Sequence, residues 1–195
     1  MLKRESPLHI FNHHSLTKIN DITIQELQHT TKINLRGSLN NNNFISNVGK
    51  VFNDVLPSKA NTFVKFKSLC IIWLGPNEWL ITEKNEKNKI ILLEKLQKAV
   101  GSSEASVTNI SENRTVIQIS GTKIFTLLAK FLTLDFDKCF AKPTNVAQTL
   151  FVKVPVLLVR TYEAMQVPTL DIYVNRSQAN YVYKLLVDGA VNLDF

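Results

Sequence analysis

The sequence predicts an α+β fold made of two related β-α-β-β-α halves, and three observations predict it. Residues 69–82 hold two apolar runs separated by Gly75-Pro76-Asn77, a tripeptide that favours a turn over a continued strand. Stretches with apolar residues at helical spacing alternate with short strand-like runs. The order of these patterns in residues 30–101 is similar to that in residues 110–190. Amphipathic helices interleaved with hairpins predict helices packed on a sheet.

The stretch 69–82 is expected to be a β-hairpin, because its two arms are rich in β-branched and aromatic residues. It contains both tryptophans of the chain, Trp73 and Trp79. Each can bury a large area, so we expect them to anchor a core. A tryptophan that proved exposed would become a candidate for partner binding, since aromatic residues are enriched at binding hot spots.

Before the hairpin, we expect a short strand around residues 33–35 that ends at Gly37. The asparagines at 40–43 can cap a helix, because their side chains accept hydrogen bonds from free backbone N–H groups. Pro57 ends that helix. Its apolar stripe consists of Phe44, Val48, Val51, Phe52 and Val55.

After the hairpin, Asn88 is the expected cap of a second helix, which ends at Gly101. Residues 115–120 alternate as a strand, which Gly121 closes before a third helix. The apolar stripes of these two helices are Leu92, Leu93, Leu96, Ala99 and Val100 in the first, and Ile124, Leu127, Leu128, Phe131 and Leu132 in the second.

The last part of the chain continues this order. Residues 149–160 are expected to be a bent or edge strand, because Pro155 interrupts an otherwise apolar run. Apolar residues alternate in 170–174, which predicts a further strand. Ser177 is the expected cap of a final helix. The apolar positions of that helix are Ala179, Val182, Leu185 and Leu186.

The expected domain organisation is an N-terminal arm, 1–21, followed by a single α+β body, 22–195. The arm is polar and irregular, and it lies on the body or on a partner. Within the body, residues 33–38 (INLRGS) and 117–122 (IQISGT) form similar strand-to-helix joints. We therefore interpret about 30–101 and 110–190 as pseudo-repeats, with duplication as a hypothesis.

Composition indicates a soluble globular protein, with 45% hydrophobic and 20% charged residues. The net charge of +7 comes from lysines and arginines scattered along the chain, a pattern that favours solubility over nucleic-acid binding. Cys70 and Cys139 lie far apart and predict no disulfide framework. The start of the chain has no apolar segment typical of a secretory signal, and no run is long enough to span a membrane. We expect a cytoplasmic protein.

Known catalytic patterns are absent from the sequence. Glycine is scarce, and there is no phosphate-binding glycine loop and no HExxH metal motif. His9, His13 and His14 are interpreted as surface or interface residues rather than metal ligands, since no Cys or carboxylate cluster lies near them. Cys139 is expected to be a half-buried structural residue, and 135–137 a polar loop after a helix. This favours a binding or assembly module over an enzyme acting alone.

Several longer motifs carry a resemblance. They are LGPNEWL at 74–80, SENRTVIQISG at 111–121, LDF at 134–136, QT at 148–149 and NRS at 175–177, with SPL at 6–8 and LRG at 35–37. In this order and spacing they resemble the gamma subunit family of heterotetrameric sarcosine oxidase. The resemblance covers nearly the whole chain. It marks eight family-motif or partner-docking candidates: Arg36, Glu78, Trp79, Ser111, Arg114, Gly121, Gln148 and Ser177.

The resemblance implies a fold similar to the folate-binding aminomethyltransferase (glycine-cleavage T-protein) fold, which contains related α+β halves. It also implies an enzyme complex that converts sarcosine, O2 and tetrahydrofolate to glycine, H2O2 and methylenetetrahydrofolate. FAD, FMN, NAD and tetrahydrofolate are then expected on the larger subunits and zinc on the delta subunit. This chain would be the non-catalytic gamma subunit, with no cofactor or metal of its own. It would dock directly on the alpha subunit, with beta and delta also in the complex.

The sequence departs from related patterns at two places. Thr122 follows Gly121, where the family tends to have proline. Residues 138–142 lack the glycines and the glutamine of the cysteine motif found in a folate-dependent iron–sulfur assembly relative of the same superfamily.

A second hypothesis is a stand-alone folate-binding or one-carbon transfer protein, since a chain of charge +7 attracts anionic folates. A third class, an RNA-binding module, has no aromatic-basic signature to favour it.

Overall fold

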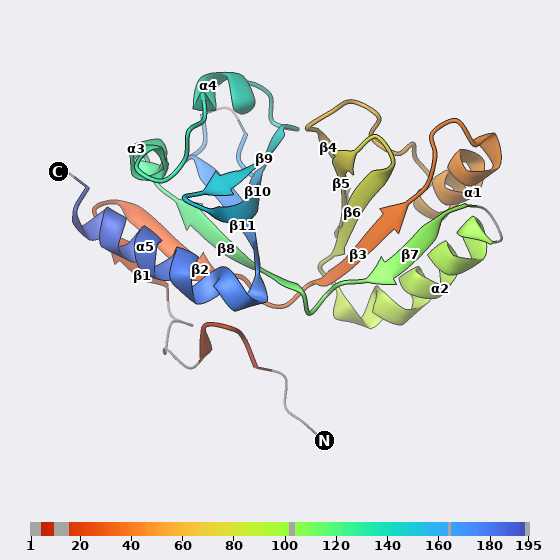
Figure 1. Cartoon of the computed structure of the whole chain (residues 1–195), viewed down its shortest axis with the longest axis horizontal. Coiled ribbons are helices and arrows are strands. Elements are labelled where there is room, and N and C mark those ends of the chain that lie inside the picture. The colour runs from red at the N-terminus through yellow and green to blue at the C-terminus, as the bar shows by residue number, and fades with distance from the viewer. Residues whose placement is uncertain (1–4, 10–15, 102–103, 164, 194–195) are drawn as a thin grey trace. The chain divides into compact units, whose positions relative to one another are not determined.

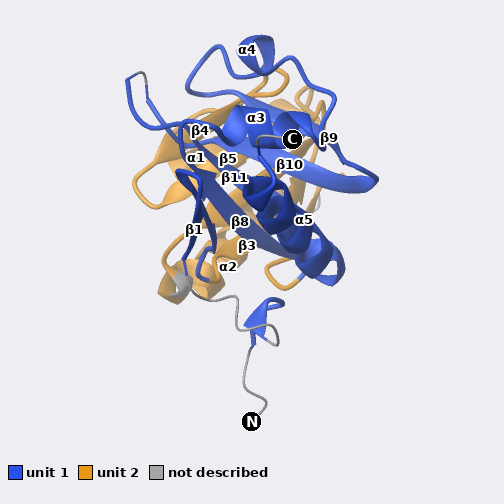
Figure 2. Ribbon diagram, turned by 90° about the vertical axis from the view of Figure 1, so that its left-hand side faces the viewer, with its two compact units in different colours: residues 1–28, 113–195 blue, residues 29–112 orange. Residues whose placement is uncertain are grey.

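The computed structural model describes residues 5–9, 16–101, 104–163 and 165–193, and its mixture of helices and two sheets confirms the α+β class (Figure 1). The chain divides into two compact units, which Figure 2 shows in different colours. Unit 1 consists of residues 1–28 and 113–195, and unit 2 of residues 29–112. Unit 1 therefore joins two stretches that are far apart in the sequence.

Unit 2 is built on a five-stranded sheet in the order β4-β5-β6-β3-β7, in which all neighbours are antiparallel. Its strands are β3 (Thr31–Arg36), β4 (Phe63–Phe66), β5 (Leu69–Gly75), β6 (Glu78–Glu83) and β7 (Ser106–Asn109). Its helices are α1 (Asn42–Phe52), the short 3-10 helix η2 (Glu86–Asn88) and α2 (Lys89–Val100). The expected hairpin is confirmed, since β5 pairs with β6 around the turn at Pro76 and Asn77.

The core of unit 2 lies between one face of this sheet and the two helices. Alternation places Ile33 and Leu35 of β3 on that face, opposite Ile81 and Trp79 of β6. The helices contribute the apolar stripes that their spacing predicted. The buried members of this cluster are Ile33, Leu35, Phe44, Val48, Phe52, Leu56, Ile71, Trp79, Ile81, Leu92, Leu96 and Val100.

Unit 1 is built on a six-stranded antiparallel sheet in the order β1-β2-β8-β11-β10-β9. Its strands are β1 (Thr17–Ile19), β2 (Ile22–Glu26), β8 (Arg114–Ser120), β9 (Val146–Phe151), β10 (Val154–Arg160) and β11 (Thr169–Asn175). Its helices are α3 (Ile124–Ala129), α4 (Phe136–Cys139), the 3-10 helix η3 (Arg176–Gln178) and α5 (Ala179–Val191). The described part of the chain has no helix with the length and apolar character needed to cross a membrane.

The core of unit 1 joins its sheet to α3 and α5. Ile117 and Ile119 of β8 lie in it, as the alternation of 115–120 predicted. The strand expected at 170–174 is confirmed as β11, and its three apolar residues are fully buried. Leu8 also belongs to this cluster with 0% exposure, so part of the expected N-terminal arm packs into unit 1. The nearby β1 begins at Thr17, so the expectation of irregular structure is wrong for 17–19.

The two sheets share one strand order, because β9-β10-β11-β8-β2 in unit 1 matches β4-β5-β6-β3-β7 in unit 2. The strands that directly precede the two halves, β2 and β7, are exchanged between the two sheets. β2 precedes β3 along the chain but pairs with β8, whereas β7 precedes β8 but pairs with β3. Each sheet is thus completed by a strand that directly precedes the other half in the sequence. This matching order agrees with the duplication hypothesis, which stays a prediction, as does the division into 1–21 and 22–195.

Each half has one strand more between its helices than the sequence indicated. In unit 2 the extra strand is β4; in unit 1 the expected strand at 149–160 is a hairpin of β9 and β10. Val152 in its turn has φ 58°, a left-handed conformation typical of turns. Pro155 is not on an edge strand, because β10 lies between β9 and β11. The pairing of β10 with β11 begins at Val156. It therefore does not require the backbone N–H that Pro155 lacks.

The first helix follows the predicted signals at its start but not at its end. The side chain of Asn41 accepts hydrogen bonds from the backbone N–H groups of Asn43 and Phe44, so the asparagine cap is confirmed. The helix ends before Pro57, because Asn53 adopts a left-handed conformation with φ 55°. Val55 therefore lies outside the helical stripe and is 66% exposed.

The remaining helix ends differ from prediction in three places. Asn88 precedes α2 but its side chain makes no capping hydrogen bond, while Gly101 at φ 53° ends the helix as expected. α3 ends at Ala129, before the predicted stripe does, although Leu132 remains buried. Ser177 lies within η3, so it does not cap α5.

The polar loop expected at 135–137 is wrong for 136–137, because these residues begin the short helix α4, which Asp135 caps. The Asp135 carboxylate accepts a hydrogen bond of 3.1 Å from the backbone N–H of Lys138 and lies 3.0 Å from the Lys138 Nζ. These bonds, the backbone one first, hold the pKa of Asp135 below its ordinary value of 3.8. Cys139 in the same helix is half-buried, as predicted, and neither cysteine is in a disulfide.

Gly121 connects β8 to α3 in a conformation that other residues rarely adopt, with φ 147°. Its N–H donates a 3.0 Å hydrogen bond to the carbonyl oxygen of Pro168. A Cβ at this position would lie 3.0 Å from the Cα of Ile22 and still closer to the carbonyl oxygen of Asp21. Both obstacles are backbone atoms, so the position admits only glycine without rearrangement.

We expect Gly121→Ala to lower the free energy of unfolding by about 1–3 kcal/mol, through backbone strain and overpacking against β2. Gly75→Ala is the matched control, because its added Cβ would meet nothing closer than the Cβ of Glu78 at 3.8 Å. Urea denaturation of both variants measures the difference. Equal stability of the two alanine variants would contradict the close packing at Gly121.

We expect the Asp135 carboxyl to titrate below pH 3.8 in the folded chain, measured by side-chain carboxyl NMR. Because the folded pKa is depressed, its stabilising contribution is present above the unfolded pKa and is lost as pH falls through the folded pKa. Lys138→Gln should leave most of the depression in place, since the backbone N–H is the larger cause. A pKa at or above 3.8 would argue against this cap.

Candidate functional site

The polar face of β3 brings together two of the eight candidate residues. Its core-facing residues alternate with Lys32, Asn34 and Arg36 on the other face. Glu78 lies directly opposite Arg36, on β6. Its Oε1 accepts a 2.6 Å hydrogen bond from Asn34 Nδ2, and its Oε2 lies 2.9 Å from Arg36 Nη2. The Arg36 side chain is 59% exposed, so its ion pair is worth only about 0–1 kcal/mol. The group fixes Glu78 by two bonds and leaves the arginine accessible.

Trp79, the next candidate, points to the opposite face and is fully buried. Its indole N–H donates a 2.9 Å hydrogen bond to the carbonyl oxygen of Pro57, and its ring centroid is 6.1 Å from that of Phe44. The expected role as a core anchor is confirmed for this residue. Trp73 faces Trp79 across the hairpin and is only half-buried.

Ser111, which is 1% exposed, extends the pairing of β3 with β7 beyond the last strand residues. Its hydroxyl accepts a 3.0 Å hydrogen bond from the backbone N–H of Lys32 and donates at 2.7 Å to Asn109 Oδ1. The backbone N–H of Ile110 donates to the carbonyl oxygen of Lys32 at 2.9 Å. The serine side chain thus supplies the ladder bond that a backbone carbonyl would otherwise provide.

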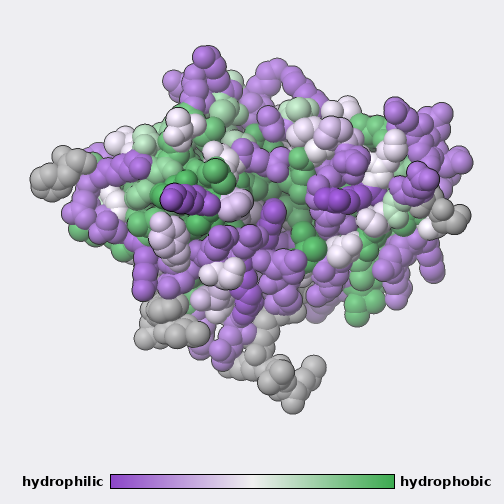
Figure 3. All heavy atoms as spheres, viewed as in Figure 1, coloured by the Kyte–Doolittle hydropathy of each residue, from purple (hydrophilic) through white to green (hydrophobic). Residues whose placement is uncertain are grey.

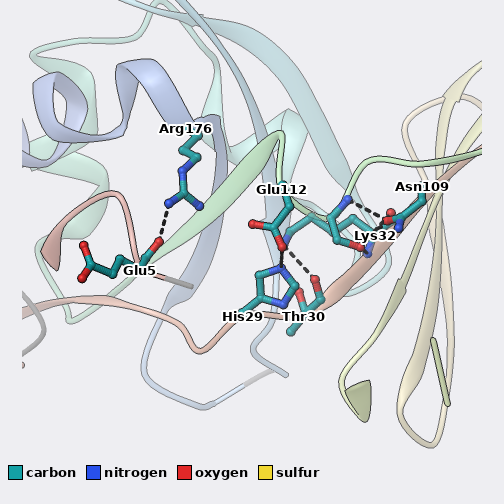
Figure 4. Close-up of polar contacts among 8 residues, drawn as sticks. Glu5, His29, Thr30, Lys32, Asn109, Glu112 and Arg176 are labelled. Carbon is teal, nitrogen blue, oxygen red and sulfur yellow. Dashed lines mark hydrogen bonds and ion pairs between the residues drawn. The ribbon is translucent and has the colours of Figure 1, made fainter. Parts of the chain in front are cut away.

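A group of charged residues that the sequence analysis did not single out lies beside Ser111, and Figure 4 shows its side chains. Lys32 is only 2% exposed, and its Nζ donates a 3.1 Å hydrogen bond to the carbonyl oxygen of Thr30. His29 Nε2 lies 3.2 Å from Glu112 Oε1. His29 and Glu112 are the first and last residues of unit 2, so this contact joins its two ends. Strand alternation gave no signal that Lys32 is buried.

The other four candidates lie in unit 1, and the structure does not gather them at one place on its sheet. Arg114 begins β8, and Gly121 follows the other end of the same strand. Gln148 is exposed on the edge strand β9. Ser177 is exposed in η3, before α5.

Unit 1 has a polar group of its own, which holds residues 5–8 against the sheet. The carboxylate of Glu26 accepts hydrogen bonds from the hydroxyls of Ser6 and Thr115. The guanidinium of Arg176 donates to the backbone carbonyl oxygen of Glu5 (Figure 4). The motif at 6–8 carried the signal for Ser6, because that serine belongs to the family-like segment. Glu26 had no such signal.

A second buried cation, also missed from the sequence, is Arg160, which is 8% exposed. Its guanidinium carbon lies 4.1 Å from the ring centroid of Tyr162, and its Nε donates at 3.1 Å to the Tyr162 carbonyl oxygen. It also donates to the carbonyl oxygen of Phe140. Arg160 therefore ties the end of β10 to the segment after α4.

Metal-ligating side chains do not cluster in the part of the chain that the structure describes: no group of three or more His, Cys, Asp and Glu residues there could hold an ion. His9 lies in a turn, where its N–H donates to the Ser6 carbonyl oxygen at 3.1 Å. His13 and His14 lie outside the described residues, so their interpretation as surface residues stays a prediction.

Comparison with known proteins relates most of the chain to one family. The model of the family described as "Sarcosine oxidase, gamma subunit family" matches residues 36–192. The sarcosine oxidase subunit gamma of Corynebacterium sp. (strain U-96) is 27% identical over 142 residues, which cover 73% of this chain and 68% of that protein.

Two solved structures resemble the fold. A chain of the heterotetrameric sarcosine oxidase from Corynebacterium sp. U-96, in complex with pyrrole 2-carboxylate, has a TM-score of 0.83 and 25% identity, covering 98% of this chain and 97% of that one. The glycine cleavage system aminomethyltransferase T from Bartonella henselae has a TM-score of 0.61 and 14% identity, covering 93% of this chain and 48% of that one. The second likeness concerns the fold alone, and it confirms the predicted similarity to the aminomethyltransferase fold.

We expect Ser111→Ala to lower the free energy of unfolding by about 1–3 kcal/mol, because it leaves the buried N–H of Lys32 without its acceptor. Ser106→Ala is the matched control, since Ser106 is an exposed residue of β7 and its loss should change stability by no more than about 0.5 kcal/mol. Chemical denaturation of the two variants compares them. A Ser111 variant as stable as the Ser106 variant would contradict the proposed contribution of the Ser111 hydroxyl to the pairing of β3 with the end of β7.

Proposed function

The chain belongs to the sarcosine oxidase gamma subunit family, which confirms the resemblance of its motifs, and from this premise we propose that it is a non-catalytic subunit of a heterotetrameric sarcosine oxidase. The observation that carries the proposal is the superposition on a chain of the Corynebacterium complex, which covers 98% of this chain and 97% of that one. Because nearly all of both chains match, the proposal applies to both units and not to one shared element.

In this proposal the chain docks directly on the alpha subunit and supports assembly of a complex that also contains beta and delta subunits. The complex oxidises sarcosine with O2 and transfers the one-carbon unit to tetrahydrofolate, giving glycine, H2O2 and methylenetetrahydrofolate. FAD, FMN, NAD and tetrahydrofolate are held by the larger partner subunits and zinc by delta. The proposed place of action is the cytoplasm.

The hydrogen bonds of the candidate residues support a structural role for them rather than a catalytic one. The Glu78 carboxylate accepts hydrogen bonds from Asn34 and Arg36. The Ser111 hydroxyl accepts one from the backbone N–H of Lys32 and donates one to Asn109. Hydrogen bonds of this kind hold the strands around Arg36 in one arrangement, so a partner that contacts Arg36 has little left to order on binding. Arg36, exposed yet paired, is the member of this set that can contact a partner without losing its position.

The competing proposal is a stand-alone folate-binding or one-carbon transfer protein, and the fold likeness to aminomethyltransferase T makes it worth an experiment. Calorimetry of the isolated full chain with tetrahydrofolate distinguishes the two. Micromolar binding, about −8 kcal/mol, would favour the competing proposal. No heat of binding, together with assembly as described next, would favour the subunit role.

We expect the purified full chain to enter one stable complex when it is mixed with the alpha, beta and delta subunits from the same cells, as measured by size-exclusion chromatography. Omitting it should lower the yield of complex and, with it, the rate of sarcosine oxidation. An equal amount of an unrelated protein of similar mass serves as the control. Assembly and turnover that are the same without the chain would refute the subunit role.

A further inference from the structure

An open groove of about 460 Å³ lies between α1 and α2 of unit 2. We call it the lysine groove, and it is lined by Asn47, Lys50, Val51, Lys95, Lys98 and Ala99. Both helices turn their fully buried residues toward the sheet, Val48 on α1 and Leu96 on α2. The groove is therefore on the solvent side of the helix pair. In Figure 3, hydrophilic residues cover most of the surface around these helices, with smaller hydrophobic areas between them.

The three lysines of the groove are exposed and concentrate positive charge in a small space. Lys95 and Lys98 are three residues apart on α2, so they lie on one side of that helix, and Lys50 faces them from α1. In the described chain, none of the three makes an ion pair. Like charges at this spacing repel one another, so an anion bound among them would relieve a cost that the free chain carries.

Helix stabilisation explains only part of this arrangement. Lys50 and Lys98 lie in the last turns of α1 and α2, where a cation interacts favourably with the helix dipole. Lys95 lies before the last turn of α2, so the helix dipole does not explain why a lysine stands there. Glu94, four residues before Lys98, does not line the groove, and neither does Asp54, which follows α1.

The groove also has an apolar component. Val51 and Ala99 line it and are half-buried. Ile91, one helical turn before Lys95 and on the same side of α2, is 54% exposed. Apolar residues beside lysines suit a segment that carries both carboxylates and apolar side chains. The lining has no aromatic residue on which a nucleotide base could stack, which disfavours a nucleic acid.

We propose that the lysine groove is the docking site for an acidic segment of a partner subunit in the heterotetramer. This inference rests on the proposed function and adds to it the place and the chemistry of the contact. Carboxylates of the segment pair with Lys50, Lys95 and Lys98, and its apolar side chains cover Val51, Ala99 and Ile91. Charge complementarity of this kind speeds encounter and fixes the register of the two proteins.

The test replaces the groove charges in the full chain and measures binding to the purified partner subunits by surface plasmon resonance. The test variant is Lys50→Glu/Lys95→Glu/Lys98→Glu, and the matched control is Lys59→Glu/Lys142→Glu/Lys153→Glu, all exposed and outside the groove. Each variant lowers the net charge by six, from +7 to +1. We expect the groove variant to bind at least about tenfold more weakly, and the control variant to bind like the unaltered chain.

Three further measurements keep the outcome independent of folding. Circular dichroism confirms that each variant is folded, and the neutral variant Lys50→Gln/Lys95→Gln/Lys98→Gln should bind with intermediate affinity. Carbodiimide coupling of the unaltered complex should join a groove lysine to an aspartate or glutamate of a partner subunit, identified by mass spectrometry. Lysines that couple only elsewhere, or a groove variant that binds like the control, would overturn the inference.

Two other outcomes have separate meanings. Micromolar binding of inorganic pyrophosphate to the isolated chain, abolished in the groove variant, would assign the groove to a small anion and overturn the docking inference. If the unaltered chain binds none of the partner subunits, the proposed function fails, and the docking inference fails with it.

Discussion

The exchange of β2 and β7 between the two sheets decides which segments of the chain make up each unit. β3 and β8 are each hydrogen-bonded on one side to their own hairpin and on the other to a strand that lies next to the opposite partner in the sequence. The sheet of unit 1 cannot be completed by a contiguous piece of chain, which is why this unit is assembled from residues 1–28 and 113–195, whereas all strands of unit 2 lie within residues 29–112. The polar groups around Ser111 and Glu26 lie where these exchanged strands end.

The free-energy contributions of the buried hydrogen bonds are larger than those of the surface ion pairs. An exposed pair such as Arg36 with Glu78 contributes about 0–1 kcal/mol, whereas removing the acceptor of a buried N–H costs about 1–3 kcal/mol. Ser111 is therefore a structural residue of unit 2, and Arg36 is available for recognition. The lysines of the groove are also available for recognition, because they are exposed and make no ion pair in the described chain.

Local patterns predicted most of the elements and the pairing of β5 with β6, but not the pairing of strands that are distant in the sequence. Alternation and turn chemistry located β3, β5, β6, β8 and β11, and the asparagine cap located α1. The hairpin of β9 and β10 was missed because apolar residues stand on both sides of the turn at Val152 and the turn lacks glycine. The burial of Lys32 and Arg160, like the strand exchange, depends on tertiary neighbours that no window of sequence contains. The candidate residues were found through family-like motifs, and the groove was not, because its lysines come from two separate helices.

We propose that this chain works as one subunit of a larger oxidase. Native mass spectrometry of the complex retrieved from its own cells through a tag on this chain tests this proposal. The predicted result is one species in which a single copy of the chain accompanies three different polypeptides and which oxidises sarcosine. A chain recovered alone, while sarcosine oxidation stays with the untagged fraction, would contradict it.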